Sequence, residues 1–473
     1  MGLRVRNINF SLLSSESSLR FDFGFIDYEN NQSTLRETYS FFDLFEVTQR
    51  KDVCLDGLDK IKYVEIGNIS RSGDIYPVEL YFSNRNDFNE AYFKKIDKGN
   101  ILQANKGDVL ISSIRPNLKK LTLIDDESEK YFFTKALIHL KPKITPIIAY
   151  HLLRTVSFEF INRVSRIGKG YPTLKVNDLK TIVFDKQLVD KLIKNIDVGK
   201  ISTLTNGIAE IKEKQLDEWD IINEVLIEEL SFDIKDFEKL RDTKIHCSVL
   251  NNFGENIDMR FSSKFHHPSH RYMLDFLISK TSKRLKDFVS EPIVLGKSIS
   301  PKQYEEGTNC YYMSMATIKS WYFDSSDAKE VSNTYEDNNP NKKVAHNDII
   351  IARSGEGSIG KVALISAPDV NAVFSDFTIR VRLSNYNQQF AYYYFRSLFI
   401  QHLVEHNKKG LGNNTNIFPS QICEFPMLDF PLKKQKEIVK KIKDKIEEQQ
   451  KYAVKIKEKR TDIEKIILDT LDI

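Results

Sequence analysis

Residues 355–361 contain the glycine and lysine spacing of a nucleotide-binding motif. Gly355, Gly360 and Lys361 have the spacing of a phosphate-binding P-loop. Val362 stands where the Mg²⁺-binding serine or threonine belongs, and the residues after it predict a strand, whereas a P-loop opens a helix. We therefore expect a hairpin turn between strands at 348–352 and 361–365, and no nucleotide site.

Two groups of histidines are candidates for metal binding. His266, His267 and His270 lie close together in the sequence, but no cysteine or carboxylate stands at a useful spacing from them. His402 and His406 are four residues apart on an expected helix and lack the glutamate of a zinc-protease signature. We expect no metal site from either group.

Chemistry on DNA would also require residues that this chain lacks. An amino-methyltransferase acting on DNA needs an Asn/Asp-Pro-Pro-aromatic signature, and none of the 13 prolines is followed by another. The Pro-Asp pair of a nuclease metal site occurs once, at Pro368-Asp369, and no Asp/Glu-x-Lys follows it. We expect a chain that is not an enzyme and carries no cofactor; an enzyme with an unrecognised active site remains an alternative.

The composition is that of an ordinary globular protein of several domains. The chain has 473 residues, 41% of them hydrophobic and 29% charged, with a net charge of +4. This mildly basic balance permits nucleic-acid binding without establishing it. The four cysteines, Cys54, Cys247, Cys310 and Cys423, form no CxxC pair and are expected to be reduced thiols. With no signal-peptide stretch and no membrane span expected, we place the protein in the cytoplasm.

The elements that would position a site occur twice, about 240 residues apart. The stretch 105–111 returns at 346–351, and 133–140 returns at 374–381. Each copy mixes short strand patterns, turn signals and helices without strict alternation, so the fold is predicted as mixed α/β. We expect a first domain over 1–185, a helix over 186–235, a second domain over 236–430 and a helix over 431–473. Two diverged copies suit a protein that reads two related targets at a fixed distance.

Both helical segments carry apolar residues at heptad spacing. In the second, the positions stepping from Val439 to Ile467 are mostly apolar, with Gln449 among them; in the first, the seam from Ile201 to Val225 contains Gln215. This pattern predicts an antiparallel coiled coil between the two helices, in which the polar glutamines could fix the register. The alternative is two amphipathic helices that each pack on their own domain.

Basic and polar loops recur at equivalent places of the two copies. Arginine and lysine hold phosphates, while asparagine and other polar side chains at loop tips can reach base edges. The predicted DNA-binding residues are Arg115, Asn117, Lys119, Lys120, Arg166, Lys169 and Tyr171 in the first copy, and Arg353, Lys361, Lys408, Lys409, Asn413 and Asn414 in the second.

With these stretches in hand, the chain resembles the specificity subunits of Type I restriction–modification systems. The resemblance is carried by 105–116, by 346–355 with 359–361, by 168–174, and above all by 422–439, where an apolar strand and Pro431-Leu432 lead to Gln435 and the long helix. The first junction, 181–189, lacks the proline pair of the second.

The resemblance implies a non-catalytic reader of a split, asymmetric site in double-stranded DNA. The helices would form a spacer and dock two DNA adenine methyltransferase subunits, and a restriction/translocase subunit would join them. S-adenosylmethionine, ATP and Mg²⁺ would belong to those partners. Two other interpretations remain: a target-recognition subunit of another phage-defence DNA modification system, and a tandem-repeat scaffold that binds protein.

Overall fold

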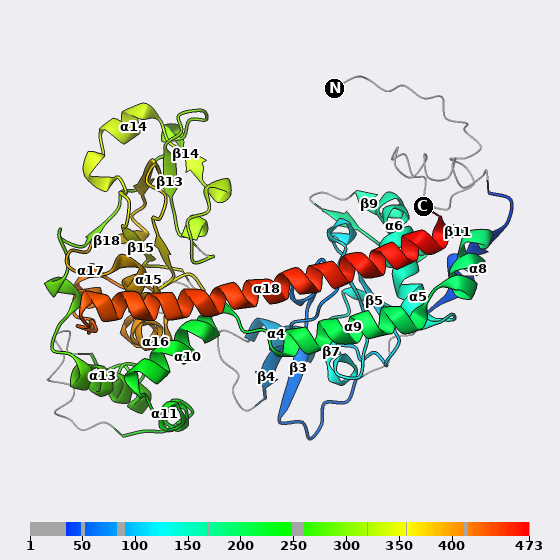
Figure 1. Ribbon diagram of the computed structural model, residues 1–473, viewed down its shortest axis with the longest axis horizontal. Coiled ribbons are helices and arrows are strands. Elements are labelled where there is room, and N and C mark those ends of the chain that lie inside the picture. Colours follow the sequence, from blue (N-terminus) through cyan, green and yellow to red (C-terminus); the bar gives the residue numbers. More distant parts are fainter. Residues whose placement is uncertain are drawn as a thin grey trace. The chain divides into compact units, whose positions relative to one another are not determined.

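The computed structural model describes residues 35–48, 53–82, 90–167, 171–247, 260–318, 320–355, 357–410 and 415–472. The chain divides into two compact units. Unit 1 comprises Met1–Glu213 and Lys455–Ile473, and unit 2 comprises Lys214–Val454. Each unit therefore combines an α/β domain with part of both helical segments (Figure 1).

The α/β part of unit 1 is built from short strands and helices. Its strands are β1 (Thr38–Ser40), β2 (Phe45–Val47), β3 (Lys60–Val64), β4 (Val78–Tyr81), β5 (Val109–Ser112), β6 (Leu121–Leu123), β7 (Phe132–Phe133), β8 (Leu137–Pro142), β9 (Arg166–Ile167), β10 (Pro172–Thr173) and β11 (Val183–Asp185). Its helices are α3 (Phe41–Leu44), α4 (Glu90–Asp97), α5 (Pro146–His151), α6 (Phe158–Val164) and α7 (Val176–Leu179), with the 3₁₀ turns η1 (Ile66–Asn68), η2 (Pro116–Leu118) and η3 (Ser128–Lys130) and a π-helical turn η4 (Leu152–Val156).

Unit 2 is likewise built from short strands and helices. Its strands are β12 (Val294–Leu295), β13 (Tyr311–Met313), β14 (Lys329–Glu330), β15 (Ile349–Ala352), β16 (Val362–Leu364), β17 (Ala372–Phe374) and β18 (Thr378–Val381). Its helices are α11 (Ile234–Arg241), α13 (Pro268–Lys280), α14 (Asn333–Asp337), α15 (Gln388–Arg396), α16 (Leu398–Asn407) and α17 (Pro419–Ile422), with 3₁₀ turns η5 (Leu285–Asp287), η6 (Pro301–Gln303), η7 (Ala316–Ile318), η8 (Ser325–Asp327) and η9 (Pro340–Lys342).

The strand order shows that the two domains are copies of one fold. A four-stranded sheet has the order β2-β8-β5-β6 in unit 1 and β12-β18-β15-β16 in unit 2. A three-stranded sheet has the order β4-β3-β7 in unit 1 and β14-β13-β17 in unit 2, with an antiparallel first pair and a parallel second pair in both. The mixed α/β prediction and the repeat are confirmed.

The repeated 105–111 motif forms a turn that leads into an inner strand of each four-stranded sheet, β5 or β15. The carboxylate of Asp108 accepts a hydrogen bond from the N–H of Asn105 at 2.8 Å, and Asp348 accepts one from Ala345 at 2.7 Å. Between them, Gly107 and Asn347 adopt left-handed backbone angles of φ 89° and 71°, which glycine and asparagine tolerate best. The sequence repeat is thus a repeat of turn geometry.

The segment that resembled a P-loop is a turn between two strands. Ile349, Ile350 and Ile351 of β15 pair antiparallel with Leu364, Ala363 and Val362 of β16. Gly360 lies in that turn at φ 83°, and a Cβ there would approach Val404 Cγ1 to 2.8 Å. The predicted hairpin is confirmed, and its glycines are explained by turn geometry and close packing.

The segment after the first domain is interrupted in a way that the seam pattern did not predict. It forms α8 (Lys186–Asn195), α9 (Val198–Glu213) and α10 (Glu218–Leu230), whereas the segment after the second domain is one helix, α18 (Leu432–Leu471) of 40 residues. Asp217 caps α10 by accepting a hydrogen bond from the N–H of Asp220 at 2.8 Å, which favours a new helix start at this place. Gln215, expected within the apolar seam, lies in the interruption.

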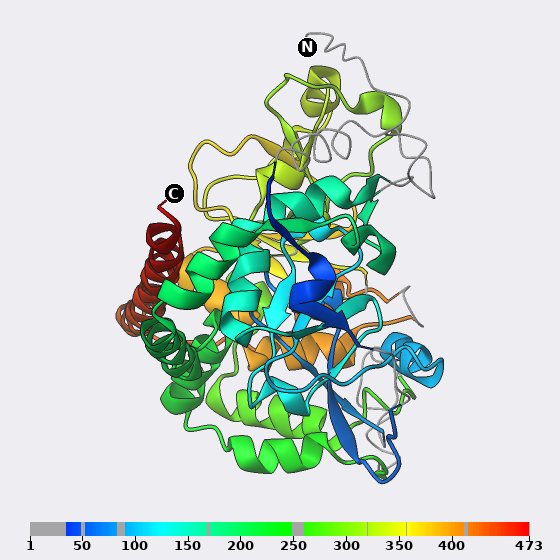
Figure 2. The ribbon, with the colours of Figure 1, turned by 90° about the vertical axis from the view of Figure 1, so that its right-hand side faces the viewer.

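In unit 1, α9 packs along the C-terminal part of α18. Ile201 and Ile208 of α9 share one apolar core with Ile456, Ile463 and Ile467 of α18. Both views show the two helices side by side (Figures 1 and 2). The core extends without interruption into the α/β domain, so the helices and the domain of this unit form one packed body.

In unit 2, α10 packs along the N-terminal part of α18. Ile222 and Val225 lie in one core with Ile438 and Ile442. Ion pairs flank this core: Glu224 with Lys445 at 2.7 Å and Glu228 with Lys441 at 2.8 Å. As the residue number rises along α10, the number of the paired residue on α18 falls, so the two helices run antiparallel.

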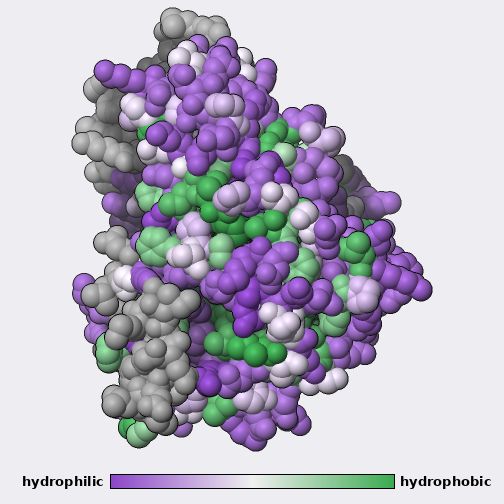
Figure 3. Space-filling model, turned by 90° about the vertical axis from the view of Figure 1, so that its left-hand side faces the viewer, coloured by the Kyte–Doolittle hydropathy of each residue, from purple (hydrophilic) through white to green (hydrophobic). Residues whose placement is uncertain are grey.

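The chain's apolar residues are mainly in these cores. On the face shown in Figure 3, hydrophilic side chains cover most of the surface and apolar ones form separate patches. None of the helices in the described part of the chain is long and apolar enough to cross a bilayer.

Candidate nucleic-acid interface

In unit 1, two loops predicted to contact DNA lie against each other. The turn after β5, which contains η2, meets the β9–β10 hairpin: the N–H of Arg115 donates to the carbonyl of Pro172 at 2.8 Å, and Ile114 forms a β-bridge with Thr173. Residues separated by more than 50 positions in the sequence therefore form one surface.

Arg115 has an unusual backbone at this surface. Its φ of 51° and ψ of 52° place a non-glycine residue in the left-handed region, and Lys119 follows with φ 57°. Strained backbone of this kind tends to occur where function requires it. The exposed Arg115 guanidinium lies 5.4 Å from the ring centre of Tyr171, which is 46% exposed. Asn117, between the two left-handed residues, is also exposed.

The other described residues predicted to bind DNA in the first domain form contacts with other parts of the protein. Lys119 lies over the Phe158 ring at 5.4 Å, and its pKa is lowered by burial and by Arg154. Lys120 donates to the carbonyl of Ile66 at 2.8 Å. Arg166 forms a 2.8 Å ion pair with a buried carboxylate, that of Asp178. Lys169 lies outside the described residues.

Unit 2 repeats the arrangement with different side chains. The carbonyl of Arg353 accepts from the N–H of Ile417 at 2.8 Å, Ser354 bridges to Asn416, and Asn416 bridges to Lys409. The Arg353 guanidinium lies 5.1 Å from the Phe418 ring centre and donates to Asn416 Oδ1 at 3.2 Å. Each domain thus carries an arginine beside an aromatic ring where two loops pair.

The remaining predicted residues of the second domain differ in exposure. Lys361 is partly buried over Trp321 at 5.7 Å, and burial lowers its pKa. Lys408 is buried and pairs with Glu405 at 2.9 Å, whereas Lys409 is partly exposed. Asn413 and Asn414 lie outside the described residues.

Sequence reasoning did not select Asn416 or Phe418, which complete the arginine site of the second domain. The sequence does contain a pattern that could have indicated them. Asn416-Ile417-Phe418 follows the basic stretch of the second copy, as Tyr171-Pro172-Thr173 follows the basic stretch of the first. The aromatic residue, however, stands at a different place in the two copies.

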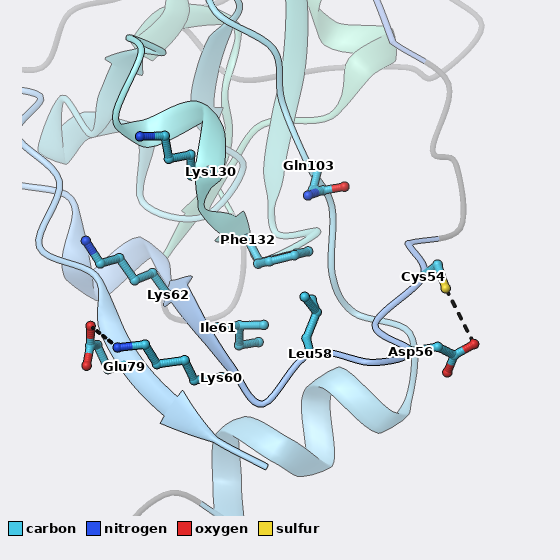
Figure 4. A pocket seen from close by; sticks show the side chains of 10 residues that line it. All are labelled: Cys54, Asp56, Leu58, Lys60, Ile61, Lys62, Glu79, Gln103, Lys130 and Phe132. Carbon is cyan, nitrogen blue, oxygen red and sulfur yellow. Dashed lines mark hydrogen bonds and ion pairs between the residues drawn. The ribbon is translucent and has the colours of Figure 1, made fainter.

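Each three-stranded sheet borders a cavity, and the two cavities differ in charge. The first, of about 520 Å³, is lined by the side chains labelled in Figure 4, among them Lys60, Lys62 and Lys130 around Leu58 and Phe132. All three lysines pair with carboxylates: Lys60 with Glu79 at 3.4 Å, and the other two with Glu127 at 2.9 and 3.6 Å.

The cavity of the second domain, about 590 Å³, is lined by Tyr304, Glu305, Glu306, Gly307, Tyr311, Ser325, Ala328, Lys329 and Glu330. Its charged side chains are three glutamates and one lysine, whereas those of the first cavity are three lysines, Asp56 and Glu79. A DNA backbone would present the same negative charge to both domains, so the arginine–aromatic sites are better candidates for equivalent contacts than these cavities.

The structure brings the two histidine groups together in unit 2. The rings of His270 and His406 stack with their centroids 5.1 Å apart, and the ring centroids of His402 and His406 are 4.1 Å apart. Burial lowers the pKa of His270 to about 3, that of His402 to about 2 and that of His406 to about 4. Among the described residues, no group of three or more His, Cys, Asp or Glu is arranged to hold a metal ion. The neutral rings therefore act as packing groups.

The fold thus defines a protein of two repeated α/β domains, each carrying an arginine–aromatic site on paired loops and each joined to a helical segment. Residues 280–458 match the family described as Type I restriction modification DNA specificity domain. The match confirms, over this part of the chain, the resemblance seen in the sequence.

Three solved structures are similar over nearly the whole chain. One, from a structure of complex assembly and conformational transition of the type I R-M system, has 15% identity and a TM-score of 0.43, covering 92% of this chain and 97% of its own. The HsdS subunit from Thermoanaerobacter tengcongensis has 16% identity, a TM-score of 0.30 and coverages of 92% and 95%. The Type-I restriction-modification system S subunit from M. genitalium has 12% identity, a TM-score of 0.37 and coverages of 93% and 96%.

No curated protein sequence matches this chain significantly.

Proposed function

We propose that this chain is the DNA-binding specificity subunit of a Type I restriction–modification complex and that it reads a bipartite, asymmetric site. Each domain would read one half-site. The observation that carries the proposal is the repeat of one strand order in both domains, the second of which largely coincides with the match to the DNA specificity family. The two domains differ in their loops and cavities, which accounts for two different half-sites.

The arginine–aromatic sites supply contacts suited to DNA. A guanidinium beside a ring can offer its remaining donors to phosphate oxygens or base edges. In this proposal Arg115 and Arg353 contact the DNA, and the predicted residues Lys169, Asn413 and Asn414 add further contacts.

The helical segments serve as spacer and docking platform. The domains would extend over 1–185 and 236–430, and the segments 186–235 and 431–473 would pair as an antiparallel coiled coil. Two adenine methyltransferase subunits and a restriction/translocase subunit would bind there, in the cytoplasm. Those partners would bring S-adenosylmethionine, ATP and Mg²⁺, and this chain would perform no chemistry itself.

Mapping methylated adenines in host DNA with and without the gene tests this proposal. We expect methylation at a split site with one gap length to disappear with the gene. If the methylation pattern does not change, a protein-binding scaffold becomes the better interpretation. Loss of methylation at a continuous site would indicate a different modification system.

A further inference from the structure

The turn between β3 and β4 places one carboxylate between the first domain and both helices of unit 1. Asp74 lies at the end of this turn, where its carbonyl accepts from the N–H of Ser70 at 2.9 Å. Its side chain is only 14% exposed. A buried carboxylate is costly unless cations and hydrogen bonds surround it.

Both helices supply a cation to this carboxylate. Arg460 of α18 donates through Nη2 to both oxygens of Asp74, at 2.7 and 2.6 Å. Lys212 of α9 donates to Oδ1 of the same carboxylate. Burial by itself would raise the pKa of Asp74, but Lys212 and Arg460 outweigh it, and the pKa is lowered. Asp74 is therefore held as an anion against α9 and α18 together.

On its other side the turn is fixed to the domain. The Oγ1 of Thr122 donates to the carbonyl of Gly73 at 2.8 Å, and Arg154 donates to the carbonyl of Arg71 at 2.5 Å. Gly73 has φ 88°, and a Cβ there would lie 2.4 Å from the hydroxyl of Tyr150. The turn thus cannot shift against the domain without losing these contacts.

We propose that Asp74 is the positioning residue that fixes the pose of the first recognition domain on the helices, and hence the gap length that the complex accepts. This inference rests on the proposed function. A shifted pose would leave a buried charge without its partners, so alternative poses are penalised more than the correct pose is stabilised. Because a site with another gap length would require such a shifted pose, this penalty makes the complex discriminate between gap lengths.

The test maps methylated adenines made by the assembled complex with the full chain carrying Asp74→Asn. The amide keeps the shape and removes the charge. We expect the same half-site bases, with methylation at sites whose gap differs by one base pair rising about tenfold relative to the normal site. This factor corresponds to losing about one charge-assisted hydrogen bond. Affinity for DNA carrying only the first half-site should stay within about twofold, which a general folding defect would not allow.

Two further variants keep the test decisive. Arg460→Gln should reproduce the effect from the helix side, and it replaces Asp74→Asn if that variant does not fold. Asp74→Glu, which retains the charge, should restore most of the discrimination. Glu224→Gln, which removes a pair between α10 and α18 only, serves as the matched control and should leave the gap spectrum unchanged.

The outcomes separate the two proposals. An unchanged gap spectrum in Asp74→Asn and Arg460→Gln overturns the positioning role and leaves the proposed function standing. A wild-type complex that methylates no split site overturns the proposed function and this inference with it.

Discussion

The N–H of Leu216 donates a hydrogen bond to the side-chain Oε1 of Gln449 at 3.0 Å. Leu216 lies in the non-helical stretch between α9 and α10, where the backbone no longer finds all its helical partners. Gln449 of α18 supplies an acceptor there. Gln449, which was expected to set the register of a coiled coil, thus binds the backbone where the opposite helical segment is interrupted.

Lengthening α18 should lengthen the gap between the half-sites, because α18 is the continuous helix that belongs to both units. Four residues inserted after Val454, with four more at Gln215 to span the extra distance, add about 6 Å. This corresponds to close to two base pairs of B-DNA. We expect sequencing of methylated sites to show the same half-sites with the longer gap.

The matched control inserts four residues at Gln215 alone. That insertion lengthens a non-helical connection and leaves α18 unchanged, so the gap should not change. If the control alone lengthens the gap, the first segment and not α18 sets the distance.

Replacing Arg115 or Arg353 by alanine should weaken DNA binding for all sequences. Each change removes about one phosphate contact, so the slope of log K against log salt should become shallower by about one unit. Titrations of the assembled complex at several salt concentrations measure this. Lys445→Ala, which removes a cation on α18, is the control. An unchanged slope in both arginine variants would move the DNA face elsewhere.

The purified chain should transfer no methyl group to DNA and cut none. The reason is the missing Pro-Pro signature and the missing Asp/Glu-x-Lys after Pro368-Asp369. Incubation with DNA and labelled S-adenosylmethionine measures methyl transfer. Gel analysis of DNA incubated with the chain and Mg²⁺ measures cleavage. Label incorporated above background would contradict the non-catalytic proposal.

The histidine cluster should make the protein lose stability in acid. The folded-state pKa values of His270, His402 and His406, about 3, 2 and 4, lie below the value of 6.5 for an unfolded histidine. The unfolded chain therefore binds more protons as the pH falls below 6.5, and the loss of stability continues toward the folded values. At pH 5 each histidine should cost up to about 2 kcal/mol.

Urea unfolding of the full chain between pH 7 and pH 5 measures this loss. His402→Leu removes one titrating ring, so its unfolding free energy should fall less over that range than that of the wild type. His346, which lies away from the cluster in the sequence, gives the control variant His346→Gln. Equal pH dependence in all three proteins would show that the cluster does not titrate as described.

The sequence by itself determined the repeat, the mixed α/β class, the hairpin at 349–364 and part of the buried face of the helical segments, although not the interruption at Gln215. These depend on local signals: the alternation of apolar residues, the turn residues before Asp108 and Asp348, and the heptad spacing from Val439 to Ile467. Because such signals act within a few residues, a sequence shows them directly.

Only the tertiary structure decided which polar groups meet. Asp74 reaches Lys212 and Arg460 across 138 and 386 positions, and His270 reaches His406 from another helix. It also decided that Arg115 lies exposed over Tyr171 while Lys408 is buried against Glu405, although both looked alike as basic loop residues. Such differences come from the packing of distant segments, on which burial and charge pairing depend and which no local pattern encodes.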